Sequence, residues 1–167
     1  MLAHSRTERV ACHHYIIALG SNRPHFRYGT PARVIAAATA YLPTVAASKT
    51  IFSRPLGPSA RQYANAVALI ESDLDPLMLL AALKAIERDF GRRSTRRWGA
   101  RVLDLDIILW SGGIWSSQGL GIPHAHFRER RFVLNPCMEI APDWRDPVTN
   151  LNVAHLKARI DRNRRAA

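Results

Sequence analysis

Short apolar segments, each ended by a glycine or proline, divide the first part of the chain into alternating strands and helices. Residues 15–19 are apolar and lead into Gly20-Ser21-Asn22, which is typical of a buried strand that ends in a turn. Thr30-Pro31 offers a helix N-cap followed by proline at the first helical position, and apolar residues recur at helical spacing until Pro43. Residues 44–52 are rich in Thr, Val and Ile and predict a second strand.

Another strand and helix follow an irregular loop. Residues 53–58 are interrupted by prolines and a glycine, which predict a shaped loop. Residues 63–71 alternate, with Tyr63 and Asn65 on one face and alanines on the other, where a helix can pack closely. Asp75-Pro76 begins a helix whose apolar stripe reaches Phe90 and that ends at Gly91.

The C-terminal half predicts one more strand, a hairpin and two helices. The strand covers 102–110, the hairpin 111–121, and the helices 130–140 and 151–163. The order strand, helix, strand, strand, helix, strand predicts an α+β fold, a ferredoxin-like sandwich with an antiparallel sheet and helices on one face. We expect a single domain over residues 14–167, preceded by a disordered extension over residues 1–13.

Charge and composition narrow the function. Lysine and arginine total 24 against 13 acidic residues in a chain of 167, so the net charge is +11, and nearly all of the basic residues are arginine. The arginine excess reflects either an arginine-rich proteome or an anionic ligand, since the guanidinium group matches phosphate in a bidentate way. Acidic small molecules and nucleic acids both fit the second explanation.

Membrane and disulfide-stabilised classes are disfavoured. No apolar run approaches the length of a membrane span, and the N-terminus lacks the apolar centre of a secretory signal. Cys12 and Cys137 are isolated, which fits a reducing cytoplasm and gives neither thiol a chemical role.

The strongest chemical signal is the pair Asp104 and Asp106 within an apolar strand. Alternation places both carboxylates on one face, about 7 Å apart, where they repel unless a positive group lies between them. Mg²⁺ suits this pair, because it binds one or two carboxylates and completes its coordination with water and phosphate. The alternative is a solvent-facing pair bridged to nearby arginines.

An arginine-dense loop immediately precedes this strand. It can either clamp a polyphosphate or form a solvated basic loop, and Trp98 within it favours the first, since an indole can cover a flat ring. The arginines of this loop are Arg92, Arg93, Arg96, Arg97 and Arg101.

Two smaller groups complete the candidates. His124 and Arg130 are candidate hydrogen-bond donors to phosphate, although His124 could equally be a surface histidine. A zinc site is disfavoured, because His124 and His126 lack a third ligand at metal spacing. Tyr63 and Asn65 form an aromatic and amide pair that could hold a planar heterocycle, or serve only as core and turn residues.

These segments together resemble the 6-hydroxymethyl-7,8-dihydropterin pyrophosphokinase family, over about residues 15–147. The resemblance is carried by these motifs, in chain order: ALGSN (18–22), RPLGP (54–58), YANA (63–66), IE…GR (86–92), RWGARVLDLDIIL (97–109), IPH (122–124) and RFVL…EIAP (131–142). It implies a ferredoxin-like enzyme that transfers pyrophosphate from ATP to the hydroxymethyl pterin, with release of AMP. It further implies two Mg²⁺ ions held by Asp104 and Asp106.

The resemblance also assigns the remaining site residues. Arg92 and Arg101 match arginines that engage the phosphates during catalysis. The implied ATP-binding residues are Glu87, Arg97, Trp98, Ile107, His124 and Arg130. The implied pterin-binding residues are Ser53, Leu56, Tyr63, Asn65 and Phe132, with Tyr63 and Phe132 on either side of the ring. ATP and the pterin are then the partners of a monomer that binds neither nucleic acid nor membrane.

Some positions depart from the family pattern. Ser94 stands where an arginine is usual, Ala100 replaces a common proline, and Lys84 occupies a position that is often neutral and polar. Glycines at 119 and 121 replace polar nucleotide contacts, and Ser53 stands where threonine is frequent.

The rival interpretations are an RNA-binding module, an inactive relative, and another Mg²⁺-dependent nucleotide-binding protein of the same fold. An RNA-binding sheet would need exposed aromatic residues, whereas this face carries Asp104 and Asp106, which repel phosphate in the absence of metal. Both aspartates are intact, which disfavours the inactive relative.

Overall fold

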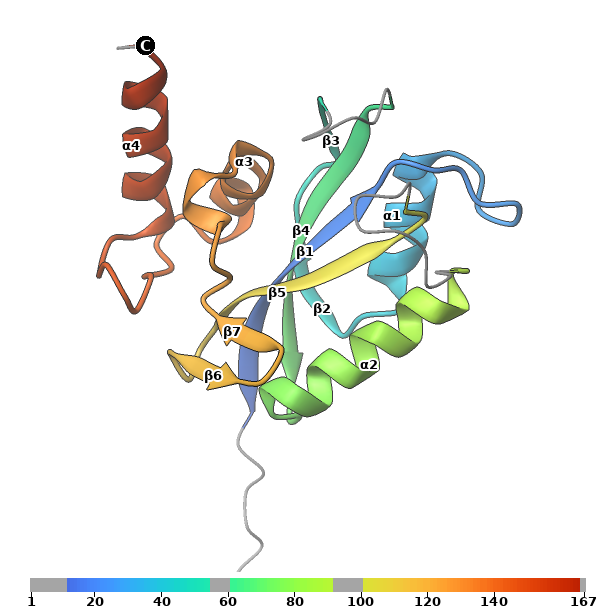
Figure 1. Cartoon of the computed structure of the whole chain (residues 1–167), viewed down its shortest axis with the longest axis horizontal. Helices are drawn as coiled ribbons and strands as arrows, with labels where there is room; N and C mark the ends of the chain where they lie inside the picture. Colours follow the sequence, from blue (N-terminus) through green and yellow to red (C-terminus); the bar gives the residue numbers. More distant parts are fainter. Residues whose placement is uncertain (1–11, 55–60, 92–100, 166–167) are drawn as a thin grey trace, which may run out of the picture.

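A five-stranded antiparallel sheet forms the centre of the protein (Figure 1). The computed structural model describes residues 12–54, 61–91 and 101–165. The strands run in the order β2-β4-β1-β5, with β3 also paired to β4. The strands of this sheet are β1 (His13–Ser21), β2 (Thr44–Ala47), β3 (Ile51–Ser53), β4 (Tyr63–Ser72) and β5 (Asp104–Trp110).

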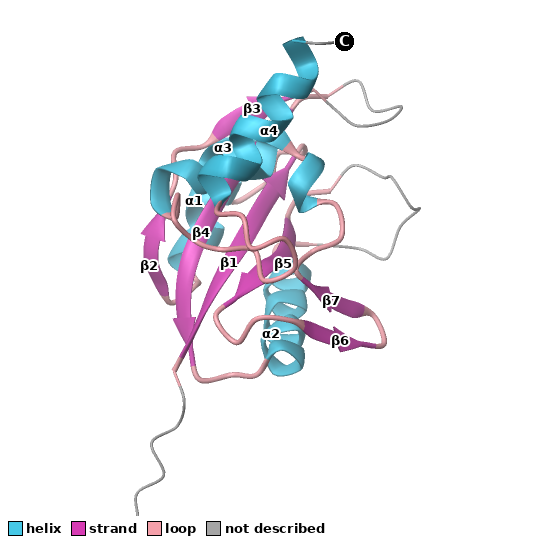
Figure 2. Cartoon of the chain, turned by 90° about the vertical axis from the view of Figure 1, so that its left-hand side faces the viewer, coloured by secondary structure: helices cyan, strands magenta, loops and turns pink. Residues whose placement is uncertain are grey.

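Helices cover both faces of the sheet, so the prediction of helices on one face is wrong (Figure 2). The helices are α1 (Pro31–Ala40), α2 (Pro76–Asp89), α3 (Arg131–Ile140) and α4 (Val153–Arg165). One core lies between the sheet and α1 and α2, and a second lies between the sheet and α3 and α4. The second core exists because Ile16, Val67 and Ile108 project from the face opposite α1 and α2.

The ferredoxin-like α+β organisation itself is confirmed. Strand β4 alternates as predicted: Ala64, Ala66 and Ala68 are buried against the α1 and α2 side, and Val67 is buried on the other. Small side chains on that face let α1 approach the sheet closely.

Several boundaries differ from the prediction. The predicted strand 44–52 is two strands, because the hydroxyl of Ser48 accepts a hydrogen bond from the Val67 amide and interrupts the ladder between them. Strand β1 begins at His13, which pairs with Ser72. Strand β5 begins at Asp104, and α4 runs two residues beyond its predicted end. Residues 1–11 of the expected extension lie outside the described part of the chain.

The segment after β5 turns back over the sheet. A small hairpin, β6 (Trp115–Ser117) and β7 (Leu120–Ile122), is followed by a short 3-10 helix, η1 (Phe127–Glu129), which leads into α3. Asp146 is fully buried and accepts two hydrogen bonds of 2.7 Å from the Arg128 guanidinium, which fixes η1 against the C-terminal segment. Within the described residues, none of the helices has the length and apolar character needed to cross a bilayer.

The start of α2 gives a test of local structure. The Asp75 carboxylate accepts a 2.8 Å hydrogen bond from the Met78 amide, whereas Thr30, at the start of α1, makes no such side-chain bond. We expect Asp75→Ala to lower the free energy of unfolding by about 1 kcal/mol, and Thr30→Ala to lower it less. Urea denaturation of both variants checks this, and equal losses would contradict it.

Candidate active site

A cavity of about 400 Å³ opens on the face of the sheet that carries α3. Strands β1, β3, β4 and β5 contribute to its wall, together with the segment from His124 to Val133. The lining residues that matter below are Ala18, Gly20, Ser53, Arg54, Tyr63, Asn65, Arg101, Asp104, Asp106, His124, Arg130 and Phe132.

The cavity exists because the central strand carries small residues where its neighbours carry polar ones. Gly20 on β1 pairs with Asn65 on β4 and with Asp104 on β5, which places the three in one row across the sheet. In the adjacent row, Ala18 pairs with Asp106. Neighbouring strands lie about 4.8 Å apart, so the amide and the carboxylates stand on opposite sides of a shallow floor.

The two aspartates project into this cavity as the alternation predicts. Leu103, Leu105 and Ile107 are buried in the core on the α2 side, whereas Asp104 and Asp106 line the cavity. Burial raises the pKa of the Asp106 carboxyl, and the negative charge of Asp104 raises it further, against the opposing effect of nearby cations. Ionised Asp106 is therefore electrostatically unfavourable here unless more positive charge is supplied.

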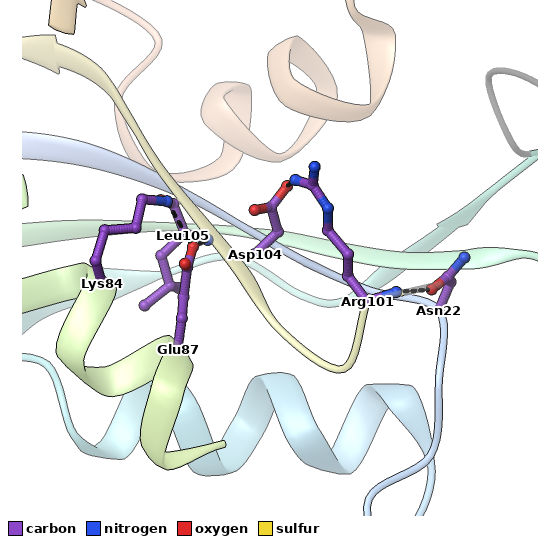
Figure 3. A network of polar contacts seen from close by, with 6 residues as sticks. All are labelled: Asn22, Lys84, Glu87, Arg101, Asp104 and Leu105. Atoms are coloured by element: carbon purple, nitrogen blue, oxygen red, sulfur yellow. Dashed lines mark hydrogen bonds and ion pairs between the residues drawn. The ribbon is translucent and has the colours of Figure 1, made fainter. Parts of the chain in front are cut away.

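Arg101 provides part of that charge (Figure 3). Its guanidinium donates a 2.7 Å hydrogen bond to the Asp104 carboxylate. Its main-chain amide donates to the side-chain oxygen of Asn22 at 2.8 Å, and its carbonyl accepts from the Asn22 amide at 3.2 Å. The turn after β1 thus fixes the residue that enters β5.

His124 and Arg130 line the cavity from the segment that precedes α3. The His124 amide donates to the Ile108 carbonyl at 3.0 Å, which holds this segment beside β5. Burial lowers the pKa of His124, and the positive charges of Arg130 and His126 lower it further. His124 is thus neutral at pH 7 and able to donate one hydrogen bond to an anion, while Arg130 supplies a full positive charge.

The other end of the cavity combines aromatic and amide groups. Asn65 is buried, and its side-chain nitrogen donates to the Ser53 hydroxyl at 2.9 Å and to the Tyr63 carbonyl at 3.1 Å. Burial raises the pKa of the Tyr63 hydroxyl, which keeps it protonated. Phe132 lines the same cavity, with the Arg130 guanidinium 5.7 Å from its ring centre.

Not every predicted site residue lies in this cavity. The side chains of Glu87 and Ile107 are buried on the α2 side of β5 and do not line it. Leu56, Arg92, Arg97 and Trp98 lie outside the described part of the chain. Their roles stay predictions from the resemblance.

Three further residues line the cavity whose contribution depends on their position more than on a motif. Ala18 and Gly20 are significant for their small size, which their alternation with Leu19 in a single strand could have indicated. Arg54 lines the cavity beside Ser53 and belongs to the quoted motif RPLGP, but it was not assigned a role.

The carboxylate pair fits a divalent cation. The raised pKa of Asp106, caused by burial and by Asp104, means that an added cation would relieve an existing unfavourable interaction. Among the described residues, no three His, Cys, Asp or Glu side chains come together as a metal site. The donor set therefore suits an ion that takes its other ligands from water and substrate phosphates, as Mg²⁺ does.

Comparison with known proteins identifies relatives over most of the chain. Residues 16–142 match the model of a family described as 7,8-dihydro-6-hydroxymethylpterin-pyrophosphokinase. A protein of Haemophilus influenzae named 2-amino-4-hydroxy-6-hydroxymethyldihydropteridine pyrophosphokinase is 43% identical over 134 residues, covering 76% of this chain and 81% of the relative. The protein of that name from Pseudomonas aeruginosa is 42% identical over 137 residues, covering 78% of this chain and 82% of the relative.

A solved structure supports the fold. The crystal structure of Plasmodium falciparum HPPK-DHPS with pteroate has a TM-score of 0.67 to this chain at 12% identity. The similarity covers 89% of this chain and 42% of that larger chain.

The repulsion at Asp106 predicts a stability that depends on pH. Because the pKa of Asp106 is raised in the folded chain, its contribution to stability is present below the ordinary aspartate value of 3.8 and is lost as pH rises through the folded-state pKa. Without divalent cations, we expect Asp106→Asn to be more stable than the wild type at pH 7, because the substitution removes the ionised carboxylate beside Asp104. Urea denaturation across pH measures this.

The difference in stability between Asp106→Asn and the wild type should disappear at pH values below the ordinary aspartate pKa, where the carboxyl group is protonated. The exposed Asp143 gives a matched control, since Asp143→Asn should leave stability unchanged. An Asp106→Asn variant that is less stable than the wild type at pH 7 would show that the ionised carboxylate is satisfied by the protein alone.

Proposed function

Because this chain belongs to the 7,8-dihydro-6-hydroxymethylpterin-pyrophosphokinase family, we propose that it transfers the pyrophosphoryl group of ATP to 6-hydroxymethyl-7,8-dihydropterin. The products are AMP and the pterin pyrophosphate, an intermediate of folate biosynthesis. The observation that carries this proposal is the cavity, which joins a carboxylate pair with cationic neighbours to an aromatic and amide pocket. Its volume of about 400 Å³ is in the range of small-molecule sites.

The polar end of the cavity suits the phosphates of ATP. Arg101 and Arg130 supply permanent positive charge, and neutral His124 supplies a hydrogen-bond donor. Enzymes of this family use ATP, which implies a divalent cation. We assign two Mg²⁺ ions to Asp104 and Asp106; when bound, they would neutralise phosphate charge and stabilise the entering and leaving oxygens.

The opposite end suits the pterin. Tyr63 and Phe132 offer aromatic faces for a planar ring, and Asn65 and Ser53 offer polar atoms for its edge. Gly20 lies beside Asn65, where an added Cβ would be 3.9 Å from the side-chain oxygen of Asn65. The absence of a side chain at Gly20 thus leaves this oxygen open to a ligand.

The reaction requires positioning and charge neutralisation more than a strong base. The hydroxymethyl oxygen of the pterin forms a bond to the β-phosphorus as the bond from that phosphorus to the oxygen of the α-phosphate breaks. AMP leaves, and the hydroxyl proton passes to solvent. Arg101 and Arg130 stabilise the charge that spreads over the phosphoryl oxygens, while the pocket around Tyr63 and Asn65 holds the attacking group in line. Arg92, Arg97, Trp98 and Leu56 are assigned to the same site by the resemblance.

The setting of the enzyme is also part of the proposal. We propose that the enzyme acts as a monomer in the cytoplasm. Cys12 and Cys137 are free thiols, which suits the reducing cytoplasm.

Loss of one carboxylate tests the reaction directly. We expect Asp106→Ala to lower pterin-dependent AMP release from MgATP by about 100-fold or more, since it removes charge compensation at the transferring group. The exposed Asp143 again provides the control, as Asp143→Ala should match the wild type. A folded wild-type protein that releases no AMP with the pterin would identify an inactive relative.

Asn65→Ala tests the pterin end. Removal of its hydrogen bonds should weaken binding of the pterin by about tenfold, with ATP binding unchanged. Calorimetric titration with each substrate measures this, and Asn163→Ala on the exposed side of α4 is the control. If Asn65→Ala weakened the binding of ATP instead, the assignment of ATP and the pterin to the two ends of the cavity would have to be reversed.

A further inference from the structure

Leu105 lies between the two aspartates at an edge of the sheet. Strand β5 is the last in the order β2-β4-β1-β5, so one of its edges faces α2 (Figure 3). In an antiparallel pair, main-chain groups of successive residues point alternately toward and away from the neighbouring strand. Side chains of α2 form hydrogen bonds with the amide and the carbonyl of Leu105, so these two main-chain groups point away from β1.

Two side chains of α2 satisfy both of these groups. The Glu87 carboxylate accepts a 2.7 Å hydrogen bond from the Leu105 amide, and the Lys84 ammonium donates to the Leu105 carbonyl at 3.2 Å. Lys84 and Glu87 are also ion-paired at 2.7 Å, one helical turn apart. We call this arrangement the Lys84–Glu87 clasp.

Burial shows that the clasp is built into the protein. The Glu87 side chain has no exposed surface, and that of Lys84 is one-third exposed, at 33%. A buried ion pair contributes little net stability compared with apolar residues of similar size. Glu87 differs from an apolar residue in one respect: its carboxylate accepts from the Leu105 amide, so it fixes the main chain at this strand edge.

The clasp acts on the segment where placement matters most. Its hydrogen bonds fix the main chain of Leu105, and the side chains immediately before and after this residue are the carboxylates that line the cavity. A shift of about 1 Å in a reacting group can cost 100-fold in rate. A strand edge held by two directional hydrogen bonds resists such a shift.

We propose that Lys84 and Glu87 are positioning residues, which act through the main chain of Leu105 to set the relative placement of Asp104 and Asp106. The inference rests on the proposed function, since that reaction gives the placement its significance. It predicts an effect on turnover, whereas a direct contact of Glu87 with the nucleotide would affect the KM for ATP.

The test compares Lys84→Met, Lys84→Arg and Lys157→Met. Lys157 is a matched control, because it is 32% exposed and forms a 2.6 Å pair with Asp161 on α4, away from the cavity. Each variant is assayed for kcat and KM with MgATP and the pterin. Hydrogen exchange at the Leu105 amide is measured by NMR in the same proteins.

We expect Lys84→Met to lower kcat by about tenfold or more, with the KM for ATP within about twofold of the wild type. The Leu105 amide should exchange faster in this variant, and Lys84→Arg, which keeps a cationic donor, should recover most of the loss. Lys157→Met should match the wild type. A kcat for Lys84→Met equal to that of Lys157→Met, or a change confined to the KM for ATP, would overturn the proposal.

Two further arrangements keep the test decisive. If Lys84→Met does not fold, the double variant K84M/E87Q replaces it with the same expectations, because it removes both charges of the pair and keeps a side-chain acceptor for the Leu105 amide. If the wild type forms no AMP with the pterin, the proposed function fails on the wild type itself. The hydrogen-exchange rate of the Leu105 amide then tests whether the clasp holds the main chain of Leu105. Faster exchange in Lys84→Met supports this role, and an unchanged rate overturns it.

Discussion

The repulsion between two carboxylates on one face of β5 is the constraint on which the rest of the site depends. Asp106 is half-buried next to Asp104, and its pKa is raised by desolvation and by that neighbouring charge. Arg101, Arg130 and Lys84 lie near enough to oppose this rise. They reduce the unfavourable energy without removing it, which leaves the site suited to bind further positive charge.

The fold supplies this arrangement from several directions. The turn after β1 holds Arg101 through Asn22, the segment before α3 brings His124 and Arg130 beside β5, and α2 binds the outer edge of the strand. Small residues on β1 leave the space between these groups open. The cavity is thus a consequence of strand order as much as of the side chains that line it.

Local patterns predicted the parts of the fold that depend on neighbouring residues. The alternation along β4, the start of α2 at Asp75 and its end near Gly91 all follow from local rules, and the structure confirms them. The placement of helices on both faces was missed, although Ile16 with Ile17 and Ile107 with Ile108 are adjacent apolar pairs that require burial on both sides of a strand.

The candidate site was predictable to the extent that its residues belong to motifs. Asp104, Asp106, Tyr63 and Asn65 were identified from spacing and residue type, and the structure places them around one cavity. The contribution of Gly20 depends on its pairing with both Asn65 and Asp104, and that of Lys84 on the docking of α2 beside Leu105. Such relations between distant segments are fixed by the tertiary structure. The local alternation of Ala18 and Gly20 with Leu19 could have indicated only that small residues share one face of the strand.

The most direct measurement of the central claim is the identity of the products, followed by ³¹P NMR with MgATP and 6-hydroxymethyl-7,8-dihydropterin. The account predicts that AMP and a pterin diphosphate ester appear together in equal amounts, and that neither forms when the divalent cation is chelated. Formation of ADP with a pterin monophosphate would contradict it, because the attack would then be at the γ-phosphorus.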